Sequence, residues 1–313
     1  MQIVFLDAKT MGDIPNLKRV EEFGKLTIYQ TSTSEQVLER VKGFDVAIAN
    51  KVKIKKEVMK QCPELKLICV AATGTDNIDI QFAKEKGILV KNAKDYSTHS
   101  VAQLTFTLIL GLLCQLRYYD DFVKEGQYSQ SDIFTSTDRP FWQLFGKEIG
   151  IIGLGNIGRQ VAQIAEGFGM KIIYYSSSGQ NRHPAYPRLE LEELLKTSDI
   201  VSIHSPLNEK TKNLITYKQL KLMKPSALLI NTSRGGIVKE ADLAKAIDEE
   251  LIRGAGVDAY EKEPLPANHP YLSVKNKDNL LLTPHMAWTS IEARTLLMNI
   301  VYDNIKNFVE TGE

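Results

Sequence analysis

The chain has 313 residues, of which 43% are hydrophobic and 25% charged, so it can bury a normal core and is not a disordered segment. Its 39 Lys and Arg residues nearly balance its 38 Asp and Glu residues. This balance argues against a nucleic-acid or membrane-surface partner, because either would need a basic field.

The first third of the chain alternates short β-type runs with helical patterns. We predict strands at 2–7, 25–29, 45–50 and 65–72, and helices at 35–43 and 55–62. Within the first of these helices, Val37, Leu38 and Val41 share one face. Alternation of this kind predicts βαβ units and a parallel sheet.

A second series follows a long apolar helix predicted at about 97–117. Its strands are predicted at 148–153, 170–175, 199–204, 227–231, 253–260 and 279–285, and its helices at 156–169, 191–197 and 240–249. A final helix is predicted at 289–310. The length suggests about two domains, and the two series predict that the second α/β domain is inserted after the first.

Residues 118–147 are predicted to be a polar connection with scattered aromatic side chains. A connection of this length in a compact protein is usually functional or part of an interface.

The remaining segments indicate no export signal and no membrane span. The first ten residues fit a β-strand better than a leader, and the apolar stretch 101–116 is short for a membrane span. Cys62, Cys69 and Cys114 are too scattered for a disulfide framework or a metal pair. We therefore expect a cytoplasmic protein without a metal, in which Cys69 is a small buried residue.

A glycine-rich turn, Gly153-Leu-Gly155-Asn-Ile-Gly158, joins a predicted strand to a predicted helix. Gly153 permits a tight turn, Gly155 lets backbone amides approach a pyrophosphate, and Gly158 lets the helix pack closely on the strand. The helix N-terminus offers free N–H groups and a positive dipole to the phosphates. In this context the turn predicts binding of a nicotinamide-type dinucleotide.

The next predicted strand does not end in the acidic residue that would hold the ribose 2′-hydroxyl of NAD. Ser176 stands in that place, and a 2′-phosphate would not be repelled there. Arg182 could accept such a phosphate or could be a solvated loop charge. We therefore predict NAD as the cofactor, with NADP or the use of both as open alternatives.

Four ordered segments resemble one family. NTSRGGIV (231–238), GVDAYEKEPLP (256–266) and TPHMAWTSIEAR (283–294) resemble the signature segments of the D-isomer-specific 2-hydroxyacid dehydrogenases, and ATGTDNIDI (71–79) resembles their substrate-side loop. The resemblance covers essentially the whole chain and is closest to the glycerate dehydrogenase (hydroxypyruvate reductase) branch.

The resemblance implies an α/β fold of two Rossmann-like or flavodoxin-like parallel-sheet domains, with the active site in the cleft between them. The substrate domain would be discontinuous, 1–96 plus 287–313. The NAD(P)-binding domain would be 97–286.

Reduction of a 2-oxo acid needs a proton donor for the carbonyl oxygen and a cation for the carboxylate. Histidine titrates near neutral pH, arginine holds a carboxylate bidentately, and a neighbouring carboxylate stabilises a charged imidazole. The resemblance assigns these catalytic roles to His285, Arg234 and Glu263.

Each assignment has rivals of the same residue type. Glu261 rivals Glu263 by chemistry alone, but the family pattern puts the functional carboxylate directly before Pro264. His204 could line the cofactor crevice or be structural. His269 lies in a polar loop and is expected to be exposed.

Substrate contacts are expected from the first domain. Thr73, Gly74 and Thr75 follow a predicted strand, where successive backbone N–H groups could form an anion nest for the substrate carboxylate. Lys51 could add a cation at the rim or be a solvated lysine. Asp79 is expected to cap the next helix.

The resemblance also implies further cofactor contacts. These are Asn156, Ile157, Ser205, Pro206, Thr232 and Asp258, of which Asp258 lies near the nicotinamide amide or is purely structural.

The expected function is reduction of a short 2-oxo acid, hydroxypyruvate or glyoxylate, to D-glycerate or glycolate with NAD(P)H, and the reverse reaction. Alternatives are the same reaction on D-lactate, a branched 2-oxo acid or phosphoglycerate, and a dinucleotide-sensing, corepressor-like binding protein. We expect a homodimer, because the family is commonly dimeric through the region of the 101–116 helix and the 118–147 connection. No nucleic-acid or membrane partner is expected.

Overall fold

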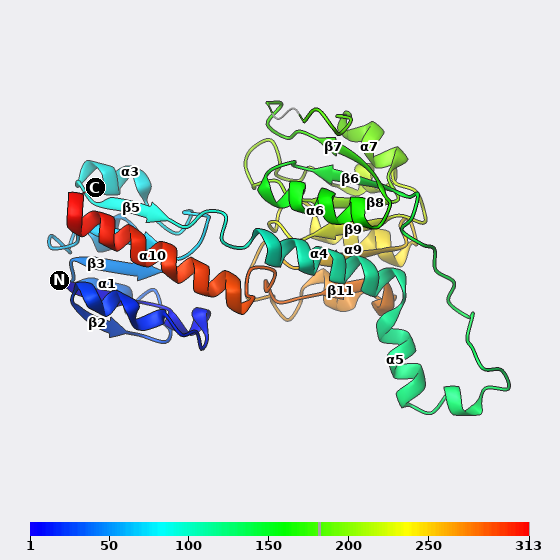
Figure 1. Ribbon diagram of the computed structural model, residues 1–313, viewed down its shortest axis with the longest axis horizontal. Helices are drawn as coiled ribbons and strands as arrows, with labels where there is room; N and C mark the ends of the chain where they lie inside the picture. Colours follow the sequence, from blue (N-terminus) through cyan, green and yellow to red (C-terminus); the bar gives the residue numbers. More distant parts are fainter. Residues whose placement is uncertain (181–182, 313) are drawn as a thin grey trace. The chain divides into compact units, whose positions relative to one another are not determined.

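The computed structural model describes residues 1–180 and 183–312. It divides into two compact units, Met1–Ser97 with Thr289–Glu313 (unit 1) and Thr98–Trp288 (unit 2). Figure 1 shows the elements of each unit coloured along the sequence. Unit 1 is discontinuous, because its last helix comes from the C-terminal end of the chain.

Unit 1 is built on a five-stranded parallel sheet in the order β2-β1-β3-β4-β5. The strands are β1 (Gln2–Phe5), β2 (Lys25–Ile28), β3 (Val46–Ala49), β4 (Leu67–Val70) and β5 (Leu89–Asn92). The helices are α1 (Val37–Val41), α2 (Lys56–Met59), α3 (Ile80–Glu85) and α10 (Ile291–Thr311). The central strands β3 and β4 are buried at every residue, as expected of a parallel sheet covered on both faces.

Two expectations for unit 1 are confirmed. The Asp79 side chain caps α3 by accepting a hydrogen bond from the Phe82 backbone N–H at 3.1 Å. Cys69 is fully buried within β4, and burial raises the pKa of its thiol to about 12. Strand β5 is not among the predicted strands, and the observed strands are shorter than the predicted ones.

Unit 2 is built on a six-stranded parallel sheet in the order β11-β10-β9-β8-β6-β7. The strands are β6 (Glu148–Ile152), β7 (Lys171–Tyr175), β8 (Ile200–Ile203), β9 (Leu228–Asn231), β10 (Gly254–Val257) and β11 (Leu280–Leu282). The helices are α4 (Thr98–Leu113), α5 (Leu116–Lys124), α6 (Asn156–Gly167), α7 (Leu191–Thr197), α8 (Tyr217–Leu220) and α9 (Glu240–Asp248). The predicted fold class of two parallel-sheet α/β domains is confirmed.

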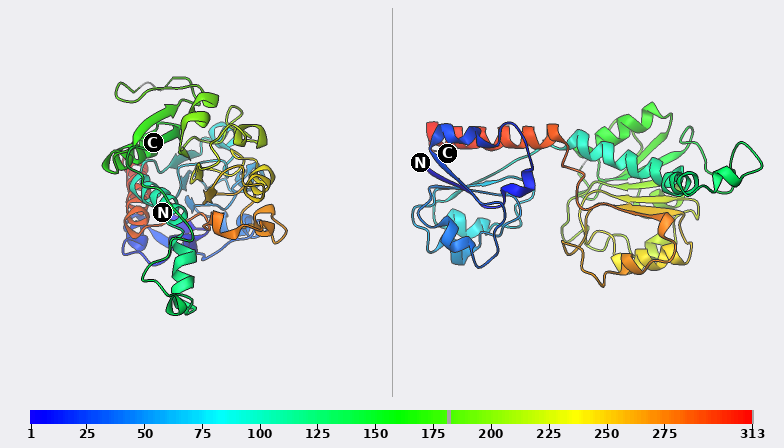
Figure 2. Two further views of the ribbon diagram at one scale, coloured as in Figure 1. Left: turned by 90° about the vertical axis from the view of Figure 1, so that its right-hand side faces the viewer. Right: turned by 90° about the horizontal axis from the view of Figure 1, so that it is seen from below.

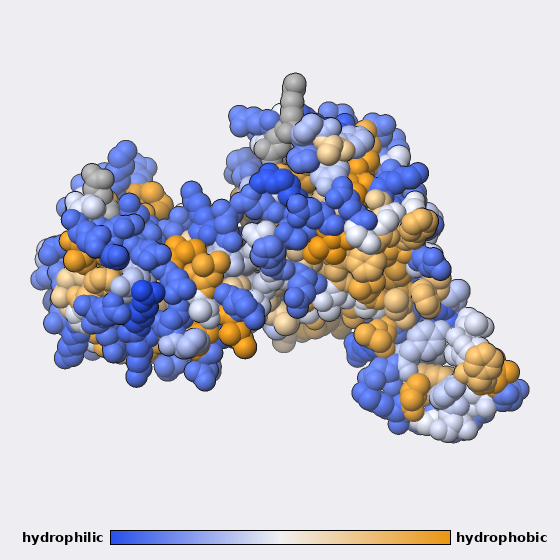
Figure 3. Space-filling model, viewed as in Figure 1, coloured by the Kyte–Doolittle hydropathy of each residue, from blue (hydrophilic) through white to orange (hydrophobic). Residues whose placement is uncertain are grey.

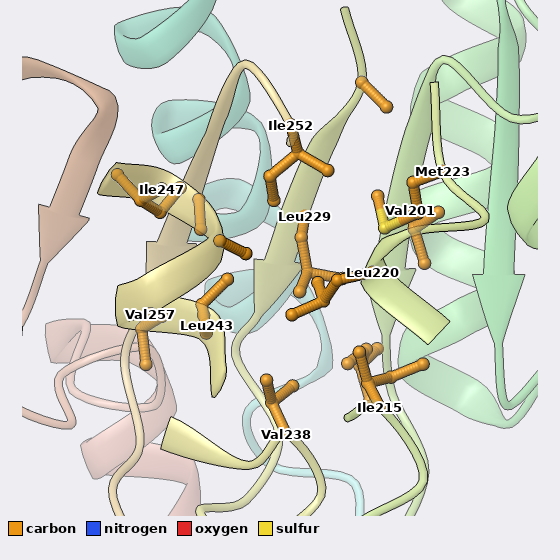
Figure 4. Close-up of a cluster of buried hydrophobic side chains, with 14 of the residues drawn as sticks. Val201, Ile215, Leu220, Met223, Leu229, Val238, Leu243, Ile247, Ile252 and Val257 are labelled. Carbon is orange, nitrogen blue, oxygen red and sulfur yellow. The ribbon is translucent and has the colours of Figure 1, made fainter. Parts of the chain in front are cut away.

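Helices cover both faces of the unit 2 sheet. On one face, Leu243 and Ile247 of α9 pack with Leu229 of β9 and Val257 of β10 (Figure 4). The other face carries α4 and α6, with Ile109 of α4 in a second buried cluster. Figure 2 shows α4 and α9 on opposite sides of the strands. The strand order reverses beside β6, and open α/β sheets bind ligands at the carboxyl ends of strands around such a point.

An arm, defined here as residues 116–143, leaves the body of unit 2 (Figures 1 and 2). The single helix predicted over 97–117 is wrong at its end, because α4 stops at Leu113 and Gln115 has a left-handed φ of 51°. Helix α5, which was not predicted, starts there and buries none of its residues. Apolar side chains gather on the arm in Figure 3. The exposed ones are Leu116, Val123, Tyr128, Ile133, Phe134 and Phe141.

Within residues 1–180 and 183–312, no single helix is long and apolar enough to cross a membrane. Only α4 and α5 taken together meet that criterion, and they are bent by 59°.

Candidate active site

The glycine-rich turn has the geometry that its sequence predicts. Gly153 follows β6 with a φ of +95°, which favours glycine. A Cβ on Gly158 would lie 2.3 Å from the Gly153 carbonyl oxygen, so only glycine lets α6 approach the strand this closely. A Cβ on Gly155 would meet nothing within 4 Å. The backbone at Gly155 therefore faces open space at the start of a 12-residue helix.

A pocket of about 620 Å³ opens over this turn. Its lining residues are Gly153, Gly155, Ser177, Ser178, Gln180, His204, Ser205, Pro206, Asn208, Glu209 and Lys210. Four of the predicted cofactor residues are therefore in the lining, namely Gly153, Gly155, Ser205 and Pro206.

The other predicted cofactor residues are not in the lining of this pocket. Asn156 and Ile157 begin α6. Thr232 is buried, and its hydroxyl bonds to the hydroxyl of Thr105 in α4 at 3.0 Å. Ser176 is buried and is not in the lining, whereas Ser177 and Ser178 are. Arg182, considered above as a phosphate contact, lies outside the described residues.

His204 supplies an observation that fits a bound dinucleotide. Its Nε2 lies 2.8 Å from the Ser202 hydroxyl, while its Nδ1 is buried without a partner in the part of the chain described. Burial lowers the pKa of His204 to about 3, so the ring is neutral. A buried polar atom without a partner is costly unless a ligand satisfies it. Together with the open space at Gly155, the orphaned Nδ1 shows that these residues fit the cofactor.

The structure brings together the two residues predicted as a catalytic pair. The His285 Nδ1 lies 2.8 Å from each carboxylate oxygen of Glu263. His285 lies three residues beyond β11 and has a φ of 52°, in the left-handed region that costs energy for a residue with a side chain. Strained backbone of this kind clusters at functional sites, where it is held by surrounding contacts.

Asp258 provides those contacts. Its carboxylate accepts hydrogen bonds from the Thr283 hydroxyl at 2.6 Å and from the backbone N–H groups of Met286 and Ala287 at 2.8 and 2.9 Å. Burial raises the pKa of Asp258, and these three hydrogen bonds oppose that shift. Asp258 therefore holds the loop that carries His285 from both sides. A contact of Asp258 with the nicotinamide stays a prediction.

Arg234 follows β9 in a turn that packs against the loop bearing Glu263. The Asn231 side-chain amide donates to the Arg234 carbonyl oxygen at 3.0 Å. A Cβ on Gly235 would lie 1.9 Å from the carbonyl carbon of Tyr260. The Arg234 turn therefore reaches the Tyr260 backbone, whose N–H donates to the Glu263 carboxylate at 3.0 Å.

The predicted substrate residues of the other domain all lie in unit 1. Thr73, Gly74 and Thr75 follow β4, and the Asn92 side chain donates to the Thr73 carbonyl oxygen at 2.6 Å. Lys51 lines a pocket of about 350 Å³ at the carboxyl end of β3, and its backbone N–H donates to Asp7 at 2.7 Å.

One histidine expectation is wrong. His269 is not exposed but is 5% accessible, and its Nε2 lies 2.7 Å from a carboxylate oxygen of Glu240. The polar, proline-containing sequence around it gave no signal of burial, because the burial comes from α9 and from Tyr271 next to it. Glu240 and Tyr260 also contribute to this region and were not identified from the sequence.

Comparisons with known proteins bear directly on this arrangement. Residues 106–287 match the family model for the NAD binding domain of D-isomer specific 2-hydroxyacid dehydrogenases. The chain is 38% identical to glycerate dehydrogenase of Methylorubrum extorquens over 98% of its own length and 96% of that protein. This chain belongs to the D-isomer-specific 2-hydroxyacid dehydrogenase family.

The dehydrogenase is also 33% identical to hydroxypyruvate reductase of Blautia hydrogenotrophica, over 99% of this chain and 97% of that one. Among solved structures, a protein of Thermus thermophilus has a TM-score of 0.88 at 30% identity, covering 99% of this chain and 97% of that one.

Two further structures contain cofactors. D-lactate dehydrogenase of Aquifex aeolicus, complexed with NAD and lactic acid, has a TM-score of 0.86 at 29% identity and covers 98% and 95% of the two chains. An NADPH-dependent glyoxylate/hydroxypyruvate reductase of Sinorhizobium meliloti, with NADP and malonate, has a TM-score of 0.85 at 26% identity and covers 100% and 94%. The predicted family is confirmed, and this dehydrogenase is an oxidoreductase that acts on CH–OH donors with NAD(P).

Gly158→Ala is expected to weaken cofactor binding by the dehydrogenase at least about tenfold, because the new Cβ would push α6 away from the Gly153 carbonyl. Fluorescence titration with NADH and NADPH measures the loss. Gly167→Ala at the end of the same helix is the matched control, since a Cβ there meets nothing within 4 Å. If Gly158→Ala and Gly167→Ala bind the cofactors equally well, the assignment of this turn to cofactor binding is wrong.

Proposed function

We propose that this dehydrogenase reduces hydroxypyruvate and glyoxylate to D-glycerate and glycolate, and catalyses the reverse oxidation. The observation that carries the proposal is the pairing of His285 Nδ1 with both oxygens of Glu263, in a loop packed against the Arg234 turn. The names of the two relatives, glycerate dehydrogenase and hydroxypyruvate reductase, support this substrate class.

The proposed roles follow from the chemistry of each side chain. The Arg234 guanidinium binds the substrate carboxylate bidentately and polarises the adjacent carbonyl. His285, charged and held through Nδ1 by Glu263, gives the proton on Nε2 to the carbonyl oxygen. When bound, the reduced nicotinamide supplies the hydride that reaches C2. In the oxidation of a D-2-hydroxy acid, neutral His285 takes the hydroxyl proton back.

The test is a substrate panel with purified protein, followed at the absorbance of the reduced cofactor. The panel contains hydroxypyruvate, glyoxylate, pyruvate, a branched 2-oxo acid and phosphohydroxypyruvate, each with NADH and with NADPH. Hydroxypyruvate and glyoxylate are expected to give the highest kcat/KM. Absence of turnover with every acid would overturn the proposal, and a preference for pyruvate would favour the D-lactate alternative, which the Aquifex aeolicus structure supports.

We also propose that the enzyme uses NADP(H) as well as NAD(H). The residues from Ser176 to Gln180, directly after β7, carry no carboxylate, and Ser177, Ser178 and Lys210 line the pocket. A 2′-phosphate there would meet hydroxyl donors and the Lys210 cation; the one carboxylate among the described lining residues, Glu209, does not follow β7, where the acid that selects NAD stands.

Ser177→Asp is expected to weaken NADPH binding at least about tenfold more than NADH binding, because its carboxylate would repel the 2′-phosphate. Titration of both cofactors gives the ratio. Ser131→Asp in the arm is the control and should leave the ratio unchanged. If Ser177→Asp weakens both cofactors equally, Ser177 does not face the 2′ position.

Unit 1 is proposed to contribute Thr73, Gly74, Thr75 and Lys51 to substrate binding. This proposal is supported by the position of these residues directly after β4 and β3. Open parallel sheets bind their ligands at the carboxyl ends of their strands. Lys51→Ala is expected to raise KM for hydroxypyruvate more than it changes kcat.

The arm is proposed to pair two copies of the enzyme as a homodimer. Helix α5 buries no residue within the chain, and Phe134 is 89% exposed, a combination typical of an interface. Phe134→Asp is expected to convert a dimer to a monomer in sedimentation velocity, with Ser136→Asp as control. A wild-type monomer would contradict the proposal. The cytoplasmic location and the lack of nucleic-acid and membrane partners stay predictions.

A further inference from the structure

We infer that Glu240 and His269, a buried pair outside the catalytic residues, position the catalytic groups by holding the peptide between Tyr260 and Glu261. The inference rests on the proposed roles of Arg234, Glu263 and His285. All of the residues concerned belong to unit 2, so the argument stays within one compact body.

The pair itself is almost inaccessible to solvent. The His269 and Glu240 side chains are 4% and 10% exposed, and His269 Nε2 lies 2.7 Å from one Glu240 oxygen. The other Glu240 oxygen accepts the Glu261 backbone N–H at 2.9 Å. Both oxygens of the carboxylate are therefore used, one for the histidine and one for the loop.

The tautomer of His269 is set by its second nitrogen. Nδ1 accepts a hydrogen bond from the Tyr271 backbone N–H at 3.2 Å, so it carries no proton there. The ring proton of a neutral His269 must then be on Nε2, where it donates to Glu240. The pair is part of a hydrogen-bond chain that converges on the Glu240 carboxylate, which accepts from His269 on one side and from the Glu261 N–H on the other.

The residues on either side of this peptide contact the segments that carry all three proposed catalytic residues. Tyr260, at its N-terminal side, donates its backbone N–H to the Glu263 carboxylate at 3.0 Å. On its Arg234 side, Gly235 packs so closely that a Cβ would lie 1.9 Å from the Tyr260 carbonyl carbon and 2.2 Å from the Glu261 nitrogen.

The third link runs through the Tyr260 side chain to the His285 loop. The Tyr260 hydroxyl donates to the Thr283 carbonyl oxygen at 2.8 Å, two residues before His285. Burial raises the pKa of Tyr260, and the carboxylates of Asp258, Glu263 and Glu240 raise it further. The hydroxyl therefore stays protonated and remains a donor.

A shift of this peptide would thus move Glu263, the Arg234 turn and the His285 loop together. Small displacements of catalytic groups lower the rate more than they lower the affinity for ligands. Glu240 and His269 are accordingly positioning residues, since neither touches the catalytic groups directly.

The experiment compares Glu240→Gln and His269→Leu with His269→Gln in the full chain. In Glu240→Gln an amide N–H would face either the Nε2–H of His269 or the Glu261 N–H, and in His269→Leu the donor is lost. Both are expected to lower kcat for hydroxypyruvate reduction about tenfold or more, with cofactor dissociation constants within about twofold of wild type. His269→Gln, whose amide can again donate to Glu240, is expected to recover part of the loss. Glu193→Gln, an exposed carboxylate of α7, is the control.

The pH profile separates positioning from a general loss of structure. Reduction requires charged His285, so weaker support of Glu263 should move the alkaline limb of kcat/KM to lower pH in Glu240→Gln and His269→Leu. The charged or titratable groups around the peptide are Glu240, Glu261, Glu263, Asp258, His269, His285 and Tyr271. An unchanged profile and kcat in folded variants, or a loss shared equally by His269→Gln, would overturn the inference.

Tyr260→Phe keeps the inference testable if the buried pair proves essential for folding. It removes only the hydroxyl that donates to Thr283 and should also lower kcat without weakening cofactor binding. Wild-type kcat in this variant would contradict the link to the His285 loop. Full activity in His285→Gln would instead overturn the proposed catalytic roles themselves, which distinguishes the two failures.

Discussion

His285→Gln is expected to lower kcat for hydroxypyruvate reduction by about 10²–10⁴-fold, because glutamine cannot transfer a proton and general acid catalysis contributes a factor of this size. The affinities for NADH and NADPH should remain within about twofold of wild type, since the cofactor pocket lies over the β6 turn and its lining does not include His285. Steady-state kinetics at saturating substrate and fluorescence titration measure the two quantities.

The control for this prediction is His99→Gln, which changes an exposed histidine at the start of α4. It should retain wild-type kcat. A His285→Gln enzyme that keeps more than about a tenth of wild-type kcat would show that another group protonates the carbonyl oxygen. Loss of cofactor affinity in place of kcat would show that His285 holds the cofactor.

Arg234→Lys is expected to lower kcat/KM for hydroxypyruvate by about 100-fold or more, although the charge is kept. A lysine ammonium is a point charge and cannot match the two oxygens of a carboxylate as the planar guanidinium does. Most of the loss should be in KM, because the lost contact is already made in the ground state. Initial rates over a range of hydroxypyruvate concentrations measure the division between KM and kcat.

The matched control for Arg234→Lys is Arg117→Lys, at an exposed position in α5. It should leave kcat/KM for hydroxypyruvate unchanged. A further comparison uses a neutral substrate analogue. If the carboxylate is the group that Arg234 binds, wild type and Arg234→Lys should reduce an uncharged 2-oxo amide at similar low rates. A large difference on the amide would show that Arg234 acts mainly on the carbonyl group and not through the carboxylate.

Local sequence patterns predicted the parts of this protein that depend on local physics. The glycine turn was predictable because a positive φ at Gly153 and the close approach at Gly158 each require glycine. The Glu263–His285 pair was predictable only through the family resemblance, since 22 residues separate the two in sequence. Strand ends were less accurate: the strand predicted to residue 285 ends at Leu282, where both the apolar run and the pairing with β10 stop.

The missed features depend on packing between distant segments. Nothing near His269 in the sequence indicates that Glu240, 29 residues earlier, is its partner. Asp258 was predicted as a site residue, but its three hydrogen bonds with residues 283, 286 and 287 could not be predicted. They form only because β10 and β11 lie side by side in the sheet. Helix α5 was missed because residues 118–147 were interpreted as a polar connection, and the helix buries none of its side chains against a core.

The strand order of unit 2 has a consequence for how this enzyme can change. The glycine turn, the serine run and the Ser205 loop follow β6, β7 and β8, while Arg234, Glu263 and His285 follow β9, β10 and β11. The residues proposed to select the nucleotide and those proposed to carry the acid chemistry thus occupy separate halves of one sheet edge. Substitutions in the two halves should combine additively when they share no partner. Ser177→Asp and Arg234→Lys together should therefore show the sum of their separate effects, and coenzyme preference could diverge among such enzymes while the reaction stays the same.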